Sequence, residues 1–265
     1  MKIALTADIH MGITPIPIVW SLIKQINDIS PDYLIVAGDI GEPFTYFIDV
    51  LDILTACDCP VGIIAGNHDV WATEGYNSQQ LWETEIPKAV ATYDFDYLEQ
   101  TPAILDNTAI LGTIGWYDYS AKSAACFYSD DQLWHRKYKV NNDAKYVNWP
   151  WTDKEFAELC RQKFISRLQK LDKDSEIEHI IVATHVPVFP EMQPRGIVYS
   201  PESNVYFYNY TLGNDLDNFK KINFVFSAHT HHGVYAIHTC KDERKINAWV
   251  SNSDYLEPKV MVYNA

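Results

Sequence analysis

Five short runs of apolar, largely β-branched residues each end in a polar cluster, and this repeated pattern limits the folds open to the chain. The runs are KIALTA (2–7), YLIVA (33–37), VGIIA (61–65), IIVA (180–183) and INFVF (222–226). Each run is short and bounded by turn residues, which is typical of a buried strand rather than a helix. We therefore predict an α/β fold whose buried strands carry polar residues at their ends.

The segments between these runs predict helices and further strands. Helical patterns follow the first three runs at 17–29, 43–56 and 78–92. Such alternation predicts right-handed crossovers and a largely parallel sheet. The clearest helix covers 153–171, because apolar residues recur there at helical spacing from Phe156 to Leu171. Short strands are also expected at 103–105, at 108–114 and over 233–263.

The polar clusters supply carboxylates, an amide and imidazoles. In chain order they are Asp8-Ile9-His10, Gly38-Asp39-Ile40-Gly41-Glu42, Gly66-Asn67-His68-Asp69, His185 and His229-Thr230-His231. Ligands of open α/β sheets bind at the carboxyl ends of the strands, so the five clusters can converge on one site. Mixed imidazole and carboxylate ligation suits Mn, Fe, Co, Ni or Zn better than Ca or Mg. The clusters thus predict a binuclear transition-metal centre, a site suited to hydrolysing a phosphate ester.

The order D-x-H, G-D-x-x-E, G-N-H-D, H and H-x-H resembles that of the calcineurin-like metallophosphoesterases, from Asp8 to His231. The resemblance implies an α/β fold with a two-sheet β-sandwich flanked by helices, in four layers (α/β/β/α), as one domain over 1–265. It also implies an enzyme that hydrolyses a phosphate ester with a metal-bridging hydroxide. One departure is Ala228, which precedes His229 where the family usually has glycine, and it removes no ligand.

By the same resemblance, seven residues hold two divalent metal ions. One ion would be held by Asp8, His10 and His231, and the other by Asn67, His185 and His229. The resemblance assigns the bridge to Asp39, and a carboxylate suits that position because it offers two anionic oxygens. An extended backbone would point Asp8 and His10 to opposite faces of a strand. We therefore expect the chain to turn just after the strand, as the nearby Gly12 allows.

Four further residues near the expected ligands have other roles. His68 resembles the family's non-ligand histidine, which contacts the phosphate and protonates the leaving group. Asp69 would orient the His68 imidazole, and a plain loop hydrogen bond is the alternative. We interpret Glu42 as a residue beside the site or on the surface rather than as a ligand. Arg195, in the loop after His185, is a candidate phosphate contact because arginine binds phosphate bidentately, and a surface arginine is the alternative.

Residues 116–151 form an aromatic-rich insert. They hold ten aromatic side chains, about twice the density expected from the chain-wide fraction of 14%. A second group over 199–210 adds Tyr199, Tyr206, Phe207, Tyr208 and Tyr210. We predict that the insert caps the active-site edge, with Trp116 and Tyr117 as candidate substrate contacts. The alternative is that these aromatic residues pack a lid or a dimer contact.

The composition of the chain limits which molecules it can bind and in which compartment we expect it. The formal charge of −14 argues against binding long nucleic acid, which relies on Lys and Arg. Aromatic faces can stack on bases, so the insert favours a nucleotide or another small organic phosphate. No apolar stretch approaches the roughly 20 residues that span a bilayer. The odd number of five cysteines, without CxxC spacing, fits a reducing compartment, and we expect a cytoplasmic protein.

Two other functions stay open at this stage. One is a non-catalytic scaffold that keeps the fold and binds a partner protein. Such relatives usually lose metal ligands or the catalytic histidine, whereas this chain retains all seven ligand positions and His68. The other is a protein phosphatase of the same family. Phosphomonoesters and phosphodiesters are both open as substrates.

Overall fold

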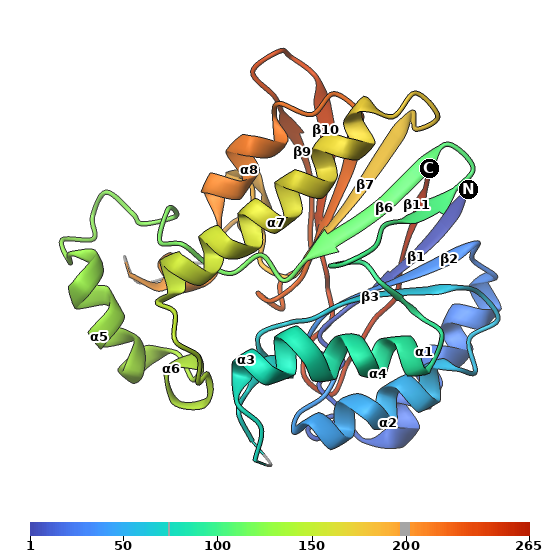
Figure 1. Ribbon diagram of the computed structural model, residues 1–265, viewed down its shortest axis with the longest axis horizontal. Coiled ribbons are helices and arrows are strands. Elements are labelled where there is room, and N and C mark those ends of the chain that lie inside the picture. Colours follow the sequence, from blue (N-terminus) through green and yellow to red (C-terminus); the bar gives the residue numbers. More distant parts are fainter. Residues whose placement is uncertain (74, 197–201) are drawn as a thin grey trace.

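Two β-sheets lie face to face at the centre of the computed structural model, which describes residues 1–73, 75–196 and 202–265 (Figure 1). The first sheet has the order β11-β1-β2-β3-β4, with β1 to β4 parallel and β11 antiparallel to β1. Its strands are β1 (Lys2–Thr6), β2 (Tyr33–Ala37), β3 (Val61–Ile64), β4 (Asp96–Tyr97) and β11 (Met261–Asn264). The predicted parallel sheet is therefore present, and a C-terminal antiparallel strand extends it.

The second sheet has the order β5-β6-β7-β8-β10-β9. Strands β6, β7, β8 and β10 run parallel, whereas β5 and β9 pair antiparallel at the two edges. The strands are β5 (Ala103–Leu105), β6 (Thr108–Thr113), β7 (His179–Thr184), β8 (Ile222–Ser227), β9 (Val234–Thr239) and β10 (Lys245–Val250). The five apolar runs are thus divided between two sheets, three in the first and two in the second.

Helices cover the outer faces of both sheets, so the predicted four-layer α/β/β/α architecture is confirmed (Figure 1). The first sheet is covered by α1 (Ile16–Ile29), α2 (Phe44–Leu54) and α4 (Ile86–Thr92). The second is covered by α7 (Asp153–Lys173) and α8 (Tyr210–Leu216). Within the described ranges, no helix is long and apolar enough to cross a membrane.

Alternate residues of each central strand enter different apolar cores. Ile3 and Leu5 of β1 pack between the sheets, whereas Ala4 packs toward the helices outside. Side chains of a strand point alternately to its two faces, and here both faces are covered. This explains why the sequence of each central strand is apolar throughout rather than alternating.

One predicted helix is interrupted. The segment 78–92 contains α3 (Ser78–Gln80), a π-helical turn (Leu81–Glu85) and then α4, with a proline in the first turn of α4. Pro87 has no backbone N–H and cannot extend a regular helix from the preceding turn. Short 3-10 helices also occur at His68–Val70, Pro190–Met192 and Ser203–Tyr206.

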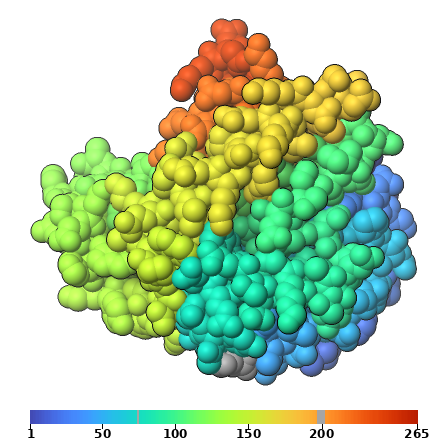
Figure 2. Space-filling model, in the orientation of Figure 1, coloured from blue at the N-terminus to red at the C-terminus, as the bar shows by residue number. Residues whose placement is uncertain are grey.

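The insert 116–151 lies beside the sandwich instead of within its layers (Figure 1). It contains two helices that the aromatic composition did not predict, α5 (Asp130–Val140) and α6 (Asp143–Tyr146). A capping box between Ser129 and Gln132 starts α5. Figure 2 shows this segment as a lobe at one side of the molecule, next to the first turns of α7.

We predict that Phe224→Ala destabilises the protein by about 3–5 kcal/mol, because a buried ring leaves a cavity when it is removed. Phe224 is fully buried between the sheets, and its ring stacks on that of Tyr263 at 3.9 Å. Urea unfolding measures the change in free energy. The control is Phe127→Ala, since Phe127 is 94% exposed and should matter little. Equal losses in the two variants would contradict this account of the core.

Candidate metal centre

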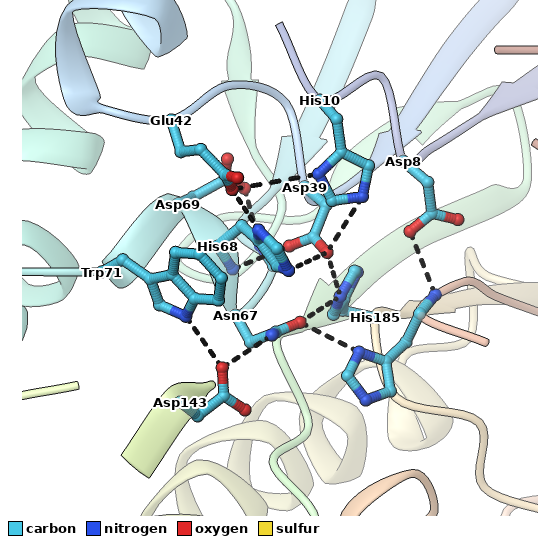
Figure 3. Close-up of polar contacts among 12 residues, drawn as sticks. Asp8, His10, Asp39, Glu42, Asn67, His68, Asp69, Trp71, Asp143 and His185 are labelled. Atoms are coloured by element: carbon cyan, nitrogen blue, oxygen red, sulfur yellow. Dashed lines mark hydrogen bonds and ion pairs between the residues drawn. The ribbon is translucent and has the colours of Figure 1, made fainter. Parts of the chain in front are cut away.

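The carboxyl ends of strands from both sheets meet at one place, and the expected metal ligands follow them directly (Figure 3). From the first sheet, the ligands follow β1, β2 and β3, and they are Asp8, His10, Asp39 and Asn67. From the second sheet, the ligands follow β7 and β8, and they are His185, His229 and His231. All are buried except His231, which is partly exposed. The site therefore lies where the two sheets meet.

Five of the seven expected ligands have a left-handed backbone. Their positive φ angles are 52° for Asp8, 47° for His10, 51° for Asp39, 70° for His229 and 55° for His231. Residues other than glycine rarely adopt this conformation, and such strain clusters at functional sites. The turn after β1 starts at Asp8 itself, which is how Asp8 and His10 come to face the same site.

Two glycines permit the close approach of the loops. Gly38 has a φ of +86°, and a Cβ there would lie 2.7 Å from Nδ1 of His185. A Cβ on Gly66 would lie 2.2 Å from Oδ1 of Asp39. Both distances are too short for a side chain, so these positions require glycine.

The first group of ligands comprises Asp8, His10 and His231, whose ligand atoms lie within 4.8 Å of one another. Several of these atoms make no hydrogen bond within the described part of the chain: Oδ2 of Asp8, both ring nitrogens of His10 and Nδ1 of His231. Leaving buried polar atoms unpaired is costly. Their convergence fits a divalent cation, which would satisfy them together.

The second group comprises Asp39, His185 and His229, also with ligand atoms within 4.8 Å of one another. Oδ1 of Asn67 lies 2.9 Å from Nε2 of His185 and 2.9 Å from Nδ1 of His229. The other nitrogen of each ring faces a backbone carbonyl, at 2.9 Å from Ala37 and 3.1 Å from Tyr206.

These carbonyls decide which ring atoms are available to a metal. A carbonyl oxygen only accepts hydrogen bonds, so in the neutral ring the nitrogen facing it carries the proton. The nitrogen that faces Asn67 then presents a lone pair, as metal-binding histidines do when their second nitrogen is held by a neighbour. When both rings are neutral, as metal binding requires, two imidazole lone pairs and an amide oxygen converge, an arrangement that fits a cation.

Asp39 lies between the two groups. Its Oδ2 is 3.3 Å from Nε2 of His185 and 3.6 Å from Nε2 of His10. Burial would raise the pKa of Asp39, but the imidazoles of His185 and His68 hold it well below its usual value. In turn, burial would lower the pKa of His185, yet the Asp39 carboxylate raises it to about 9. The position of Asp39 is the one expected of a bridging ligand.

His68 is held by a different carboxylate from the one expected. Its Nδ1 is bonded to Glu42 Oε2, and its ring stacks on Trp71 with the ring centres 3.8 Å apart. Burial would lower the pKa of His68, but Asp39 and Glu42 raise it to about 9. Glu42 is therefore a neighbour of the site that orients the imidazole.

The Asp69 carboxylate binds backbone amides rather than the His68 imidazole. Its Oδ1 accepts N–H bonds from Ile40 at 2.8 Å and from Gly41 at 3.2 Å, and its Oδ2 accepts one from Gly66 at 2.8 Å. Among the described residues, no hydrogen bond joins Asp69 to His68. Contrary to expectation, Asp69 fastens the loop after β3 to the loop after β2, and the G-N-H-D motif alone could not distinguish the two roles.

The three expected substrate contacts also lie elsewhere. Trp116 and Tyr117 are fully buried and cannot reach a substrate, because their polar groups are bonded inside to Asp153 and Asp143. Arg195 lines a separate surface hollow beside β9 and the 3-10 helix at 190–192. Of the second aromatic group, Tyr199 lies outside the described residues.

A hollow of about 260 Å³ opens over the metal ligands. Its wall also includes residues that the motifs do not contain: Trp71, Val140, Asn141, Asn142, Asp143, Phe207 and Tyr255. The ring of Tyr255 lies 4.6 Å from each of the His10 and His231 rings. Trp71, only three residues beyond His68, could have been noticed in the sequence, whereas nothing local marks Asp143 or Tyr255.

A sequence model described as calcineurin-like phosphoesterase matches residues 1–233, most of the chain and all five motifs. The chain belongs to this family. It is a metallophosphoesterase, a hydrolase of phosphoric ester bonds, and its two ligand groups fit the two metals on which the family depends.

Solved structures support the same fold. A phosphopantetheinyl hydrolase, PptH, from Mycobacterium tuberculosis is 17% identical, with 93% of this chain and 88% of that chain covered and a TM-score of 0.72. A dimetal phosphatase from Danio rerio is 14% identical, with coverage of 93% and 86% and a TM-score of 0.52. No curated protein matches the chain. At these identities the similarity establishes the fold.

We predict that Asp39→Asn lowers the metal content of the reloaded protein below two ions per chain, since the amide removes the negative charge of the group whose Oδ2 faces both ligand groups. Elemental analysis after stripping and reloading gives the stoichiometry. His68→Gln is the control and should keep both ions, because His68 is not among the expected ligands. Two ions bound with unchanged affinity in Asp39→Asn would rule out the bridging role.

Proposed function

We propose that the protein hydrolyses a small phosphorylated organic molecule, either a phosphomonoester or a phosphodiester, at a binuclear metal centre. One observation carries the proposal: ligand atoms from both sheets that make no hydrogen bond within the described part of the chain converge beside the non-ligand His68. The first ion would be held by Asp8, His10 and His231, the second by Asn67, His185 and His229, and Asp39 would bridge them. Two divalent transition metals, such as Mn, Fe, Co, Ni or Zn, would polarise the phosphoryl group and acidify the attacking water.

In this proposal His68 donates the proton to the leaving oxygen. Glu42 occupies its Nδ1, so Nε2 is the atom left to act, and it lies 4.0 Å from Oδ2 of Asp39. Trp71 fixes the plane of the ring by stacking on it. A general acid must be held in reach of the atom it protonates, and these two neighbours hold the imidazole at the hollow.

The hollow supports a small substrate. It measures about 260 Å³, and the residues 140–143 of the insert line part of its wall. This arrangement supports the insert as a cap, and it disfavours a protein phosphatase, whose substrate is a bulky folded surface. The charge of −14 disfavours long nucleic acid. The five cysteines, all within the described ranges, are free thiols, as a cytoplasmic protein would keep them.

An aromatic side chain on the wall favours a leaving group with a flat ring. Phe207 lines the hollow, and aromatic rings stack on nucleobases. A nucleotide is therefore our first substrate class. The activity named for the M. tuberculosis protein makes a phosphopantetheinyl ester the second class to test.

We predict metal-dependent turnover of para-nitrophenyl phosphate or bis-para-nitrophenyl phosphate by protein that is stripped and reloaded with Mn²⁺. His68→Gln should lower turnover by roughly 10²–10⁴-fold with metal content unchanged, as expected for loss of a general acid. Rates on the two substrates distinguish monoesterase from diesterase preference. Wild type that holds two ions yet hydrolyses neither ester, no nucleotide and no phosphopantetheinyl ester would favour the scaffold.

We predict that Phe207→Ala raises KM for a nucleoside monophosphate roughly 5- to 100-fold, the equivalent of about 1–3 kcal/mol of base stacking. Ribose 5-phosphate, which has no base, should keep its KM. The same measurement on the Phe127→Ala variant controls for loss of an aromatic ring that is far more exposed. Equal changes for both substrates would remove base stacking from the proposal.

A further inference from the structure

We infer that Asp143, supplied by the insert, is a positioning residue that fixes the metal ligand Asn67, so that the insert completes the second metal site. The inference rests on the proposed binuclear centre and concerns how one of its ligands is held. Asp143 belongs to none of the five motifs, and 76 residues separate it from Asn67.

The Asp143 carboxylate accepts three hydrogen bonds in the interior, and Figure 3 shows the two from Asn67 and Trp71. Its Oδ1 lies 2.8 Å from Nδ2 of Asn67 and 2.8 Å from Nε1 of Trp71. Its Oδ2 lies 2.8 Å from the hydroxyl of Tyr117. Only 1% of the residue is exposed, so water does not compete for these bonds. Both oxygens are therefore committed to donors, one of which is the amide of a metal ligand.

The bond to Asn67 decides which end of its amide faces the metal site. An amide has an accepting oxygen and a donating NH₂ group, and only the oxygen can bind a cation. An ionised carboxylate accepts and never donates, so Asp143 holds the NH₂ group outward. Oδ1 then points at His185 and His229, as the distances of 2.9 Å to each show. A charge-assisted bond to the NH₂ group also increases the electron density on that oxygen.

The same oxygen of Asp143 aligns the neighbourhood of His68. Trp71 donates its indole N–H to Asp143 and stacks on the His68 ring with a centre separation of 3.8 Å. One carboxylate of the insert thus fixes a metal ligand and the aromatic ring that supports the proposed general acid. Through this carboxylate the insert contacts the proposed active site directly.

A second buried carboxylate of similar surroundings gives a matched control. Asp153, at the start of α7, is also 1% exposed and accepts bonds from Trp116, Tyr119 and Lys137, at 2.6–2.7 Å. Within the described ranges, none of its bonds goes to an expected metal ligand. Changing Asp153 therefore perturbs the packing around the insert without releasing Asn67.

The experiment compares metal binding by wild type, Asp143→Asn and Asp153→Asn after stripping, with Mn²⁺ titrated against a chelator. An amide at position 143 has one accepting oxygen instead of two and carries no charge, so the bond to Asn67 is no longer charge-assisted. Asp143→Asn should therefore lower the affinity for one of the two ions by roughly 10- to 100-fold, the usual effect of removing a neighbour that orients a ligand. Asp153→Asn should bind both ions like wild type, even where both variants melt at lower temperature.

A double variant tests the same bond where Asp143→Asn alone does not fold. Asn67→Asp combined with Asp143→Asn exchanges the amide and the carboxylate, so that the bond between them is kept with its direction reversed. We expect the exchange to restore binding of the second ion. Wild-type affinity for both ions in Asp143→Asn, equal losses in Asp143→Asn and Asp153→Asn, or an exchange variant that binds the second ion no better than Asn67→Asp alone would each overturn the inference.

Metal titration also separates this inference from the proposed function. Wild type that binds two ions and hydrolyses nothing would contradict the proposed function alone, and loss of one ion in Asp143→Asn would still support the positioning role. Wild type that binds no transition metal would overturn both.

Discussion

The position of the Asp39 carboxylate between ligands from two different sheets is the constraint on which the site depends. One of its oxygens lies within 3.6 Å of imidazoles that follow β1 and β7, strands of the first and second sheet. Those strands keep their separation only because the apolar core between the sheets is filled, with Phe224 among its largest side chains. The hydrophobic core thus sets the distance between the two halves of the metal centre.

The site stores strain that the rest of the fold must offset. Five ligand residues adopt a left-handed backbone, and each such residue costs of order 1–3 kcal/mol. Asp69 opposes this strain by tying the loop after β3 to the loop after β2 through three backbone amides. Folding and metal affinity are linked, because the ligands come together only in the folded chain.

The sequence predicts what is local and fails where distant segments meet. The polar clusters each follow an apolar run, so the strands and their convergence on one site could be predicted from short patterns, whereas the four layers and the assignment of seven ligands are implied by the resemblance to the family. The orienting carboxylate of His68 could not, because Glu42 and Asp69 are both near the motif and only the folded loops show that Glu42 reaches the ring. The role of Asp143 is still harder to predict from the sequence, because Asp143 meets Asn67 only when the insert packs against the loop after β3.

The aromatic excess of the insert also has a structural reason that composition could not supply. Trp116 and Tyr117 are neighbours in sequence, yet they bond to different buried carboxylates, Asp153 and Asp143. Their rings fill the space between the insert and the sandwich while their polar groups position those carboxylates. The residues facing the hollow are instead 140–143. The insert therefore both lines the hollow and orients a metal ligand. Exchanging it to change the substrate would also remove the hydrogen bond that supports Asn67, unless a carboxylate were kept at the position of Asp143.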